Sequence, residues 1–541
     1  MKQCPQCHRV YYDEALNFCL EDGAWLTADI SDHPTEVMPR FGAAASGGSF
    51  PTQDPNESDT TRTFDLRPSA ALPPKGAVRD ANSIAVLPFA HLSSDPDDEY
   101  FCDGLAEEII NALAKIPDLK VAARTSAFLF KGRNADIGTI GRQLGVEAVL
   151  EGSVRKSGTR LRVTAQLIKT DDGYHIWSER YDREMRDVFE IQDDISVAVV
   201  GALTSKLLGE DKTPSMSKLI NELKHFRTDV EAYQIYLRGR FLFNRFNEAD
   251  LYRALACFEE AASLEPAFAE AYSGIADVYM WLTELGPITP LEGMPKAKEA
   301  ALKAIELGPE LSDAHTSYAI VLQEFEYDLA RAESEYKLAI GLNPNNALAH
   351  QMYGALLAQL DRFPEAEAEF ERSLALDPLS PMGSWIYPFG LFLARRYDDS
   401  IARARKILEL DDSFAAAYLV LSFSYQMKED LGACAENYCR FLEIFGLGDA
   451  AAEARLAYER SGWEGFLRAM TSPPARRTVT SYISAVYFQA LGDSDSAIEC
   501  LRDSLAAREG HMVMLKVDPR FDKLRPDQRF TEILNNVGFP R

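Results

Sequence analysis

The stretch Phe363-Pro-Glu-Ala-Glu-Ala-Glu-Phe-Glu-Arg-Ser-Leu-Ala-Leu-Asp-Pro378 recurs with variations through the second half of the chain. Its Ala366, Phe370 and Ser373 are four and three positions apart, so they share one face of a helix that the final proline ends. Equivalent landmarks stand at Pro266, Pro309, Pro344 and Asp412. Successive landmarks are separated by 43, 35, 34 and 34 residues, and the first interval contains an insertion. The sequence therefore predicts a helical repeat.

The same kinds of side chain recur at matching places in each unit. Ala254, Phe258 and Ala261 precede Pro266 in the way that Ala366, Phe370 and Ser373 precede Pro378. An earlier helix of the unit repeats as well, since Tyr272, Ile275, Ala276 and Tyr279 correspond to His350, Tyr353, Gly354 and Leu357. Small residues let two helices approach closely, and the aromatic residues fill the gap between neighbouring units.

A 34-residue period of paired helices is typical of tetratricopeptide (TPR) repeats. Residues 230–511 resemble a TPR array of about seven repeats, and residues 512–541 are expected to form a C-terminal extension. The alternative is an irregular helical bundle with accidental periodicity. Agreement at several positions in successive units favours the solenoid.

Residues 83–208 show the alternation of a small α/β domain. Ile84–Phe89 is an apolar strand, and Glu99–Ile116 has apolar residues at helical spacing. Ala148–Val154 and Leu161–Ile168 are expected to pair as a hairpin. The region resembles the TolB-N-terminal-like (FlgO-like) domain that precedes TPR arrays in bacterial signalling proteins. Four motifs carry the resemblance: Ile84-Ala-Val-Leu-Pro-Phe89, Phe101-Cys-Asp-Gly-Leu-Ala-Glu-Glu108, Ala148-Val-Leu-Glu-Gly-Ser-Val154 and Ile176-Trp-Ser-Glu-Arg-Tyr-Asp182.

The first 26 residues carry two cysteine turns, Cys4-Pro-Gln-Cys7 and Cys19-Leu-Glu-Asp22. Paired turns of this spacing bind Zn²⁺ in zinc ribbons, and so short a segment scarcely folds without a metal. The expected ligands of a structural zinc ion are Cys4, Cys7, Cys19 and Asp22, with His8 as the competing fourth ligand. The segment resembles N-terminal zinc ribbons of some bacterial kinases and TPR proteins. The alternative is a set of ordinary thiols on a frayed terminus.

Residues 27–80 are rich in Pro, Gly, Ser and Thr, and few apolar residues are available there, so this segment is expected to be a disordered linker. The predicted fold class is therefore multidomain: a small zinc ribbon (1–26), a linker (27–80), an α/β domain (83–208) and an all-α TPR solenoid (230–511). No apolar run reaches the length of a membrane span, and no signal peptide is recognised, so a cytoplasmic location is expected.

The formal net charge of -26 disfavours broad binding to a phosphate backbone. Phosphate-loop, nucleophile-elbow, metalloprotease-helix and kinase signatures are absent from the sequence, so we expect no enzymatic activity and assign no catalytic residue. The predicted function is a protein–protein interaction scaffold in bacterial signalling. The alternative is a transcriptional or signalling regulator whose zinc ribbon contacts nucleic acid or polymerase. The identity of a partner and the oligomeric state do not follow from the sequence.

The first helix of each TPR repeat lines the concave surface of the solenoid, and the residues there differ along the array. The early positions carry no Lys or Arg: Glu270, Ser273, Asp277, Met280, Trp281, Asp313, Thr316, Ile320, Gln323 and Glu324. The later positions are apolar, and the predicted partner-binding residues are Trp385, Phe389, Phe392, Phe423 and Met427. Clustered aromatic and Met side chains suit helix-in-groove or extended-peptide recognition. The alternative is packing against Ala450–Met470 or the α/β domain.

Overall fold

The computed structural model describes residues 2–3, 10–11, 27–28, 82–92, 99–116, 118–133, 135–157, 159–184, 188–203, 229–472 and 479–539. The chain divides into two compact units, Met1–Pro39 and Arg40–Arg541. Three two-residue strands are described in the first unit, where β1 (Lys2–Gln3) pairs antiparallel with β2 (Val10–Tyr11) and β3 (Thr27–Ala28). Strand β3 thus lies just inside the range expected to be linker. The predicted zinc ligands Cys4, Cys7, Cys19 and Asp22 lie outside the described residues.

The α/β domain is built on a mixed sheet with the strand order β6-β4-β7-β8-β9, and the short β5 pairs with β7. Strand β4 is parallel to β6 and β7, whereas β7, β8 and β9 run antiparallel. The predicted hairpin is confirmed by the pairing of β7 with β8. The strands are β4 (Ser83–Val86), β5 (Ala90–His91), β6 (Lys120–Val121), β7 (Ala148–Ser157), β8 (Arg160–Lys169) and β9 (His175–Glu184).

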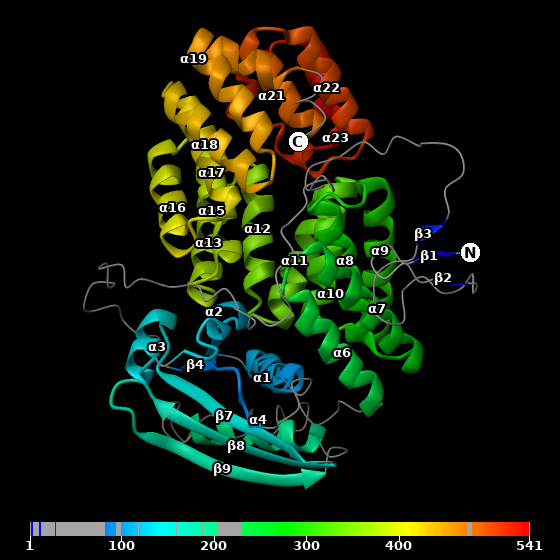
Figure 1. Ribbon diagram of the computed structural model, residues 1–541, viewed down its shortest axis with the longest axis vertical. Coiled ribbons are helices and arrows are strands. Elements are labelled where there is room, and N and C mark those ends of the chain that lie inside the picture. Colours follow the sequence, from blue (N-terminus) through cyan, green and yellow to red (C-terminus); the bar gives the residue numbers. More distant parts are fainter. Residues whose placement is uncertain are drawn as a thin grey trace. The chain divides into compact units, whose positions relative to one another are not determined.

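Helices cover both faces of this sheet. Alternate residues of β4 point to opposite sides, so they enter two different cores. Ile84 and Val86 pack in one core with α1 and α4, and Ala85 packs in a second core with α3 (Figure 1). The helices of this domain are α1 (Glu99–Ala114), α2 (Arg124–Phe128), α3 (Ile137–Leu144) and α4 (Val188–Leu203).

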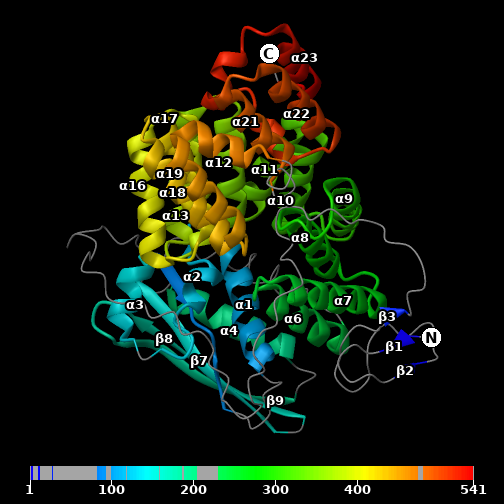
Figure 2. The same ribbon diagram turned by 45° about the horizontal axis from the view of Figure 1, so that its top comes forward.

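Pairs of consecutive helices, each joined by a short turn, follow one another from residue 229 onward (Figures 1 and 2). The pairs are α6 (Val230–Phe243) with α7 (Glu248–Leu264); α8 (Ala269–Glu284) with α9 (Pro290–Leu307); α10 (Ser312–Val321) with α11 (Leu329–Leu342); α12 (Ala347–Gln359) with α13 (Phe363–Leu376); α15 (Ile386–Leu393) with α16 (Tyr397–Leu410); α17 (Ala415–Met427) with α18 (Leu431–Ile444); and α21 (Ser481–Leu491) with α22 (Ser494–Ala506). The π-helical turn η5 (Leu322–Glu326) extends α10, and the short helix α14 (Pro381–Ser384) precedes α15. The pairs confirm the predicted TPR-type repeat. Helix α19 (Gly448–Met470) lies between the last two pairs, where the sequence departs from the repeat.

The backbone conformation also repeats with a period of 34 residues. Tyr327, Asp361, Arg395 and Glu429 follow one another at intervals of 34 residues, and each has a φ angle between 61° and 67°. They occupy the turn between the two helices of a repeat, where one left-handed residue ends the first helix. The Phe370 ring packs directly against the backbone of two glycines. A Cβ atom added at Gly354 or Gly390 would lie 2.8 or 2.6 Å from this ring. Glycine therefore lets Phe370 sit between neighbouring units.

The C-terminal extension forms two 3₁₀ segments and a helix, η6 (Gly510–Met514), η7 (Pro519–Leu524) and α23 (Gln528–Val537). It turns back onto the earlier repeats, since Arg395 pairs with Asp522 at 2.6 Å. Just before it, the Glu509 carbonyl accepts a hydrogen bond from the Tyr327 hydroxyl at 3.0 Å. Among the described residues, no helix is both long and apolar enough to span a membrane.

Candidate functional site

The edge strand β6 of the α/β sheet is completed by a side chain of the TPR array. On one side β6 pairs with β4, and on the other Asn345 accepts a hydrogen bond from the Val121 amide at 3.1 Å. The Asn345 amide group also donates to the carbonyls of Leu119 and Ala114, at 2.9 and 3.0 Å. An edge strand and the last turn of a helix such as α1 leave such backbone groups unpaired, and burying them without partners is costly. The carboxamide of Asn345 therefore takes the place of a neighbouring strand.

A second contact lies one repeat further on. Asp377 accepts hydrogen bonds from the hydroxyls of Thr125 and Ser126, at 2.5 and 2.6 Å. The backbone joins in, since the Ala123 amide donates to the Leu376 carbonyl at 2.8 Å. Burial raises the pKa of Asp377, although the Ser126 and Thr125 hydroxyls oppose that effect. The turns between repeats thus hold the segment from β6 to α2.

Glu107 of α1 connects the two domains through a buried ion-pair network. Its carboxylate lies 2.9 Å from Arg124 of its own domain and 2.7 Å from Arg240 of α6. Arg240 in turn lies 3.8 Å from Asp277 of α8. Burial opposes ionisation of Glu107, but the two guanidinium charges outweigh it and lower its pKa. With only 7% of its side chain exposed, Glu107 is screened little by solvent, so the ion pairs tie α1 to the TPR array.

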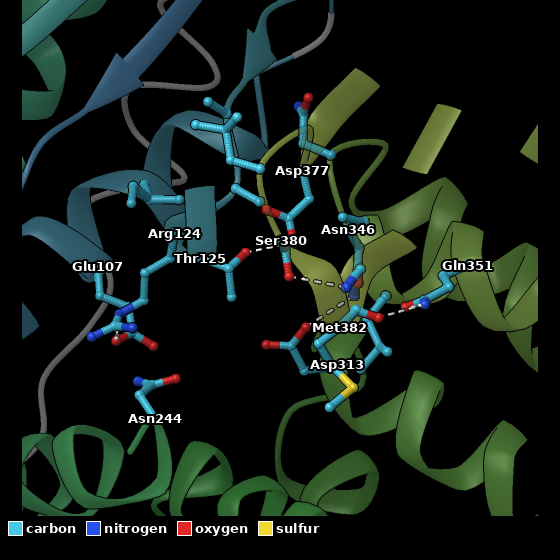
Figure 3. Close-up of a pocket in the computed structure, with 18 of the residues that line it drawn as sticks. Glu107, Arg124, Thr125, Asn244, Asp313, Asn346, Gln351, Asp377, Ser380 and Met382 are labelled. Carbon is cyan, nitrogen blue, oxygen red and sulfur yellow. Dashed lines mark hydrogen bonds and ion pairs between the residues drawn. The ribbon is translucent and has the colours of Figure 1, made fainter. Parts of the chain in front are cut away.

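A cavity of about 580 Å³ lies between these contacts. Figure 3 shows Glu107 and Arg124 on one side of it, and Asp313, Asn346 and Met382 on another. The α/β domain contributes Glu107, Ile110, Asn111, Ala114, Val121–Thr125, Leu129 and Arg133 to its lining. The TPR array contributes Arg240, Phe243, Asn244, Phe246, Asp277, Trp281, Asp313, Thr316, Ser317, Asn343, Asn345–Leu348, Gln351, Asp377, Leu379–Gly383, Leu410, Asp411 and Phe414. The cavity therefore combines an aromatic wall with carboxylate, amide and guanidinium groups.

The predicted concave positions divide in the structure. Asp277, Trp281, Asp313 and Thr316 line the cavity, which agrees with their assignment to the concave face. Met280 and Ile320 are instead buried in the solenoid core, as are the side chains of Ser273 and Gln323. Arg240 was missed by the sequence reasoning. It lies on α6, the first helix of the array, before the first proline landmark at Pro266. Counting back by one repeat from the later landmarks is the signal that could have placed it on the concave face.

The predicted partner-binding residues lie at different depths. Phe392 and Phe423 are buried, whereas Trp385, Phe389 and Met427 are partly exposed. Phe389, Phe392 and Phe423 form one aromatic cluster with ring centroids 5.8 to 6.5 Å apart. Arg520 of η7 covers part of this cluster, since its guanidinium lies 4.0 Å from the centroid of the Phe423 ring. A partner could therefore reach only the three partly exposed side chains without a rearrangement.

Arg520 is held over this cluster by a buried partner. Asp518 lies 2.6 Å from the Arg520 guanidinium, and both side chains are almost fully buried. Asp518 also accepts a hydrogen bond from the Tyr482 hydroxyl at 2.9 Å.

In the part of the chain that the structure describes, no group of three or more His, Cys, Asp or Glu side chains is placed to hold a metal ion.

The comparison with protein families matches residues 80–197 to the second domain of HilA/YgeH-like transcriptional regulators. This match covers most of the region in which the TolB-N-terminal-like resemblance was found, and that finer resemblance stays a prediction. The chain is 22% identical over 354 residues to the transcriptional regulator HilA of Salmonella paratyphi A, covering 65% of this chain and 55% of HilA.

A second curated relative changes the functional assignment. The chain is 34% identical over 259 residues to a protein of Rhizobium meliloti named "Putative adenylate cyclase 3", covering 47% of this chain and 42% of that protein. The prediction that the protein is not an enzyme is contradicted by this relative, so we no longer assign the chain to the non-enzymatic class. The chain spans about half the length of the curated relatives that it matches.

Solved structures with repeated helix pairs are also similar. The type IV pilus biogenesis factor PilW is 20% identical, with a TM-score of 0.32, and the match covers 39% of this chain and 94% of PilW. The helix pairs of the chain itself define its class: it has a TPR-type fold, and the concave surface of such a solenoid is the part that generally binds other proteins.

Proposed function

We propose that the chain is an interaction scaffold or adaptor of bacterial signalling, in which the TPR array binds a protein partner. The observation that carries this proposal is the way the array holds its own α/β domain. Asn345 and the Leu376 carbonyl pair with backbone groups of one polypeptide segment, and Asp377 binds two adjacent hydroxyls. A surface with this chemistry suits the recognition of other polypeptide segments. The relatives from Rhizobium and Salmonella support a bacterial regulatory setting.

We place partner binding on the partly exposed side chains Trp385, Phe389 and Met427. Trp385 and Phe389 have ring centroids 6.5 Å apart, and Phe389 rests on the buried Phe392 and Phe423. The buried rings fix the position of the exposed ones, so an apolar anchor of a partner would meet a preformed surface. Aromatic residues in such positions supply much of the binding free energy in protein interfaces.

The Trp385→Ala variant is expected to weaken capture of the native partner by about 2 kcal/mol or more, with little change in melting temperature. Affinity purification with mass spectrometry, using the full chain as bait in the native cell, gives the capture. Scanning fluorimetry gives the melting temperature. Trp463→Ala is the matched control, because Trp463 is also half-buried but stacks on Phe466 in α19. Unchanged capture by the Trp385 variant, or an equal loss in both variants, contradicts this surface.

A second candidate is a transcriptional regulator whose N-terminal zinc module contacts nucleic acid or polymerase. The match of residues 80–197 to HilA/YgeH-like regulators favours it. The net charge of -26 argues against a broad electrostatic contact with DNA, so a contact would be confined to one part of the chain. A salt-sensitive gel shift with the full chain, lost in Cys4→Ser, supports this candidate. Absence of a shift at low salt removes direct DNA contact.

The zinc module makes a separate prediction. We expect one structural zinc ion per chain, bound by Cys4, Cys7 and Cys19 with Asp22 or His8 as the fourth ligand, since Cys-rich paired turns of this spacing fit tetrahedral Zn²⁺. Elemental analysis of freshly purified protein should show the zinc, and Cys4→Ser or Cys19→Ser should lose it. Cys257→Ser is the control, because Cys257 lies on a repeat helix. Purified wild-type protein without zinc contradicts the assignment.

A further inference from the structure

The TPR wall of the interdomain cavity places carboxylates beside aromatic rings. Asp277 and Trp281 stand one helical turn apart on α8, and both line the cavity. Asp313 reaches the same cavity from the next repeat, on α10. The cavity of about 580 Å³ lies within the range of about 300–1,000 Å³ found for small-molecule sites. Its size and mixed lining make it suited to a ligand with a charged end and an apolar stem.

The charges around the cavity do not balance. Five carboxylates line the cavity, those of Glu107, Asp277, Asp313, Asp377 and Asp411, against three guanidinium groups, those of Arg124, Arg133 and Arg240. Arg124 and Arg240 lie within 2.9 Å of Glu107. Glu107 therefore receives most of the compensating charge. The carboxylates of the TPR wall receive less of it, and Asp277 has the longer 3.8 Å contact with Arg240.

Asp277 shows this imbalance most clearly. Only 13% of its side chain is exposed, and its hydrogen-bond donor is the neutral Ser317 hydroxyl at 2.6 Å. Burial raises the pKa of Asp277 to about 7, because Arg240 and Ser317 compensate it only in part. Asp313 likewise accepts from a neutral group, the Asn346 amide at 2.9 Å. A bound cation would add to the partial compensation that Arg240 gives both carboxylates.

The aromatic part of the wall is a second, independent feature. The Trp281 and Phe246 rings meet edge to face with centroids 4.7 Å apart, and both line the cavity. Phe246 has a φ angle of 54°, a conformation that bulky residues rarely adopt, and the turn between α6 and α7 holds it there. Aromatic faces attract guanidinium and ammonium groups, and Trp does so most strongly.

We propose that this cavity binds an organic cation, a guanidinium or ammonium group on an apolar stem, with the charge between Asp277 and Asp313 and the stem against Trp281 and Phe246. The site goes beyond the proposed scaffold function, because it lies between the two domains and not on the Trp385 surface. The aromatic wall distinguishes it from a site for a bare metal ion, which would need several further oxygen ligands. The cation is either a free amine or a basic side chain of a polypeptide, and both share this chemistry.

The test measures binding of defined probes to the full chain by isothermal titration calorimetry. Agmatine represents a free cation, and N-acetyl-arginine amide represents a side chain on a peptide backbone. N-acetyl-citrulline amide is the neutral control of nearly the same shape. We expect at least one of the two cations to bind, and the citrulline compound to bind about tenfold more weakly or not at all. Binding of agmatine alone indicates a free amine, and binding of the arginine compound alone indicates a peptide side chain.

Variants assign the binding to this cavity. Asp277→Asn and Trp281→Ala are each expected to reduce the affinity about tenfold. Glu306→Gln on the exposed side of α9 is expected to leave it unchanged. Asp313→Asn serves as a further variant if one of the first two does not fold. The proposal is overturned if neither cation binds at millimolar concentration, if citrulline binds equally well, or if the folded carboxylate variants keep full affinity.

Discussion

Glu107→Ala is expected to destabilise the folded protein by about 3–5 kcal/mol, the cost of leaving a buried charge without its partner. Two charges are affected at once, because Arg124 and Arg240 both pair with this carboxylate within 2.9 Å. Since Arg240 belongs to the TPR array and Glu107 to the α/β domain, the loss should also loosen the contact between the domains. Scanning fluorimetry and chemical denaturation measure the effect on the full chain.

Two variants delimit the cause of that effect. Glu107→Gln keeps the shape and some hydrogen bonding, so it should lie between wild type and alanine. Glu306→Ala removes an exposed carboxylate paired with Lys303 and should leave the melting temperature nearly unchanged. If Glu107→Ala melts like wild type, the buried network contributes nothing to stability and the described contact is wrong.

Phe423→Ala is expected to destabilise the protein by about 3–5 kcal/mol, as truncation of a buried aromatic residue commonly does. The Phe423 side chain is only 6% exposed and meets Phe389 and Phe392 on one side and the Arg520 guanidinium on the other. Its removal leaves a cavity and takes away the ring face beneath a buried charge. The melting temperature of the full chain is the measurement.

The control for this variant is Leu456→Ala, because Leu456 is 49% exposed on α19 and should tolerate truncation. A Phe423 variant that keeps its melting temperature but loses partner capture would place Phe423 in the binding surface after all. A variant that loses stability first shows that Phe423 supports Trp385 and Phe389 from beneath.

The repeat could be predicted from sequence because its signals are local and recur. The 34-residue spacing of Pro344, Pro378 and Asp412 is matched in the structure by left-handed turn residues at the same interval, such as Asp361 and Arg395. The alternation of strands and helices in residues 83–184 was likewise readable, because each element has its own hydrophobic period. The position of Asp277 and Trp281 on the early concave face followed from their helical spacing, whereas the nearby Arg240 was not predicted.

The site itself could not be predicted, because its contacts join residues far apart in the chain. Asn345 meets Val121 across 224 residues, and Arg240 meets Glu107 across 133. No local pattern marks Asn345 as the partner of an edge strand. The same reason explains why the burial of Phe392 and Phe423 was not predicted. Their apolar character is visible in the sequence, but Arg520, which covers them, belongs to the C-terminal extension, and the repeat pattern does not predict the position of that extension.

Docking of the α/β domain on the TPR array is tested most directly by hydrogen exchange at residues 118–126 of the full chain. The Val121 amide has Asn345 as its acceptor, whereas the neighbouring amides of Lys120 and Ala122 bond to the strand beside them. We expect slow exchange of Val121 in wild type and exchange about tenfold faster or more in Asn345→Ala, with Asn437→Ala, a remote amide on α18, as the matched control. Equally fast exchange of Val121 in wild type and in Asn345→Ala would contradict the docking.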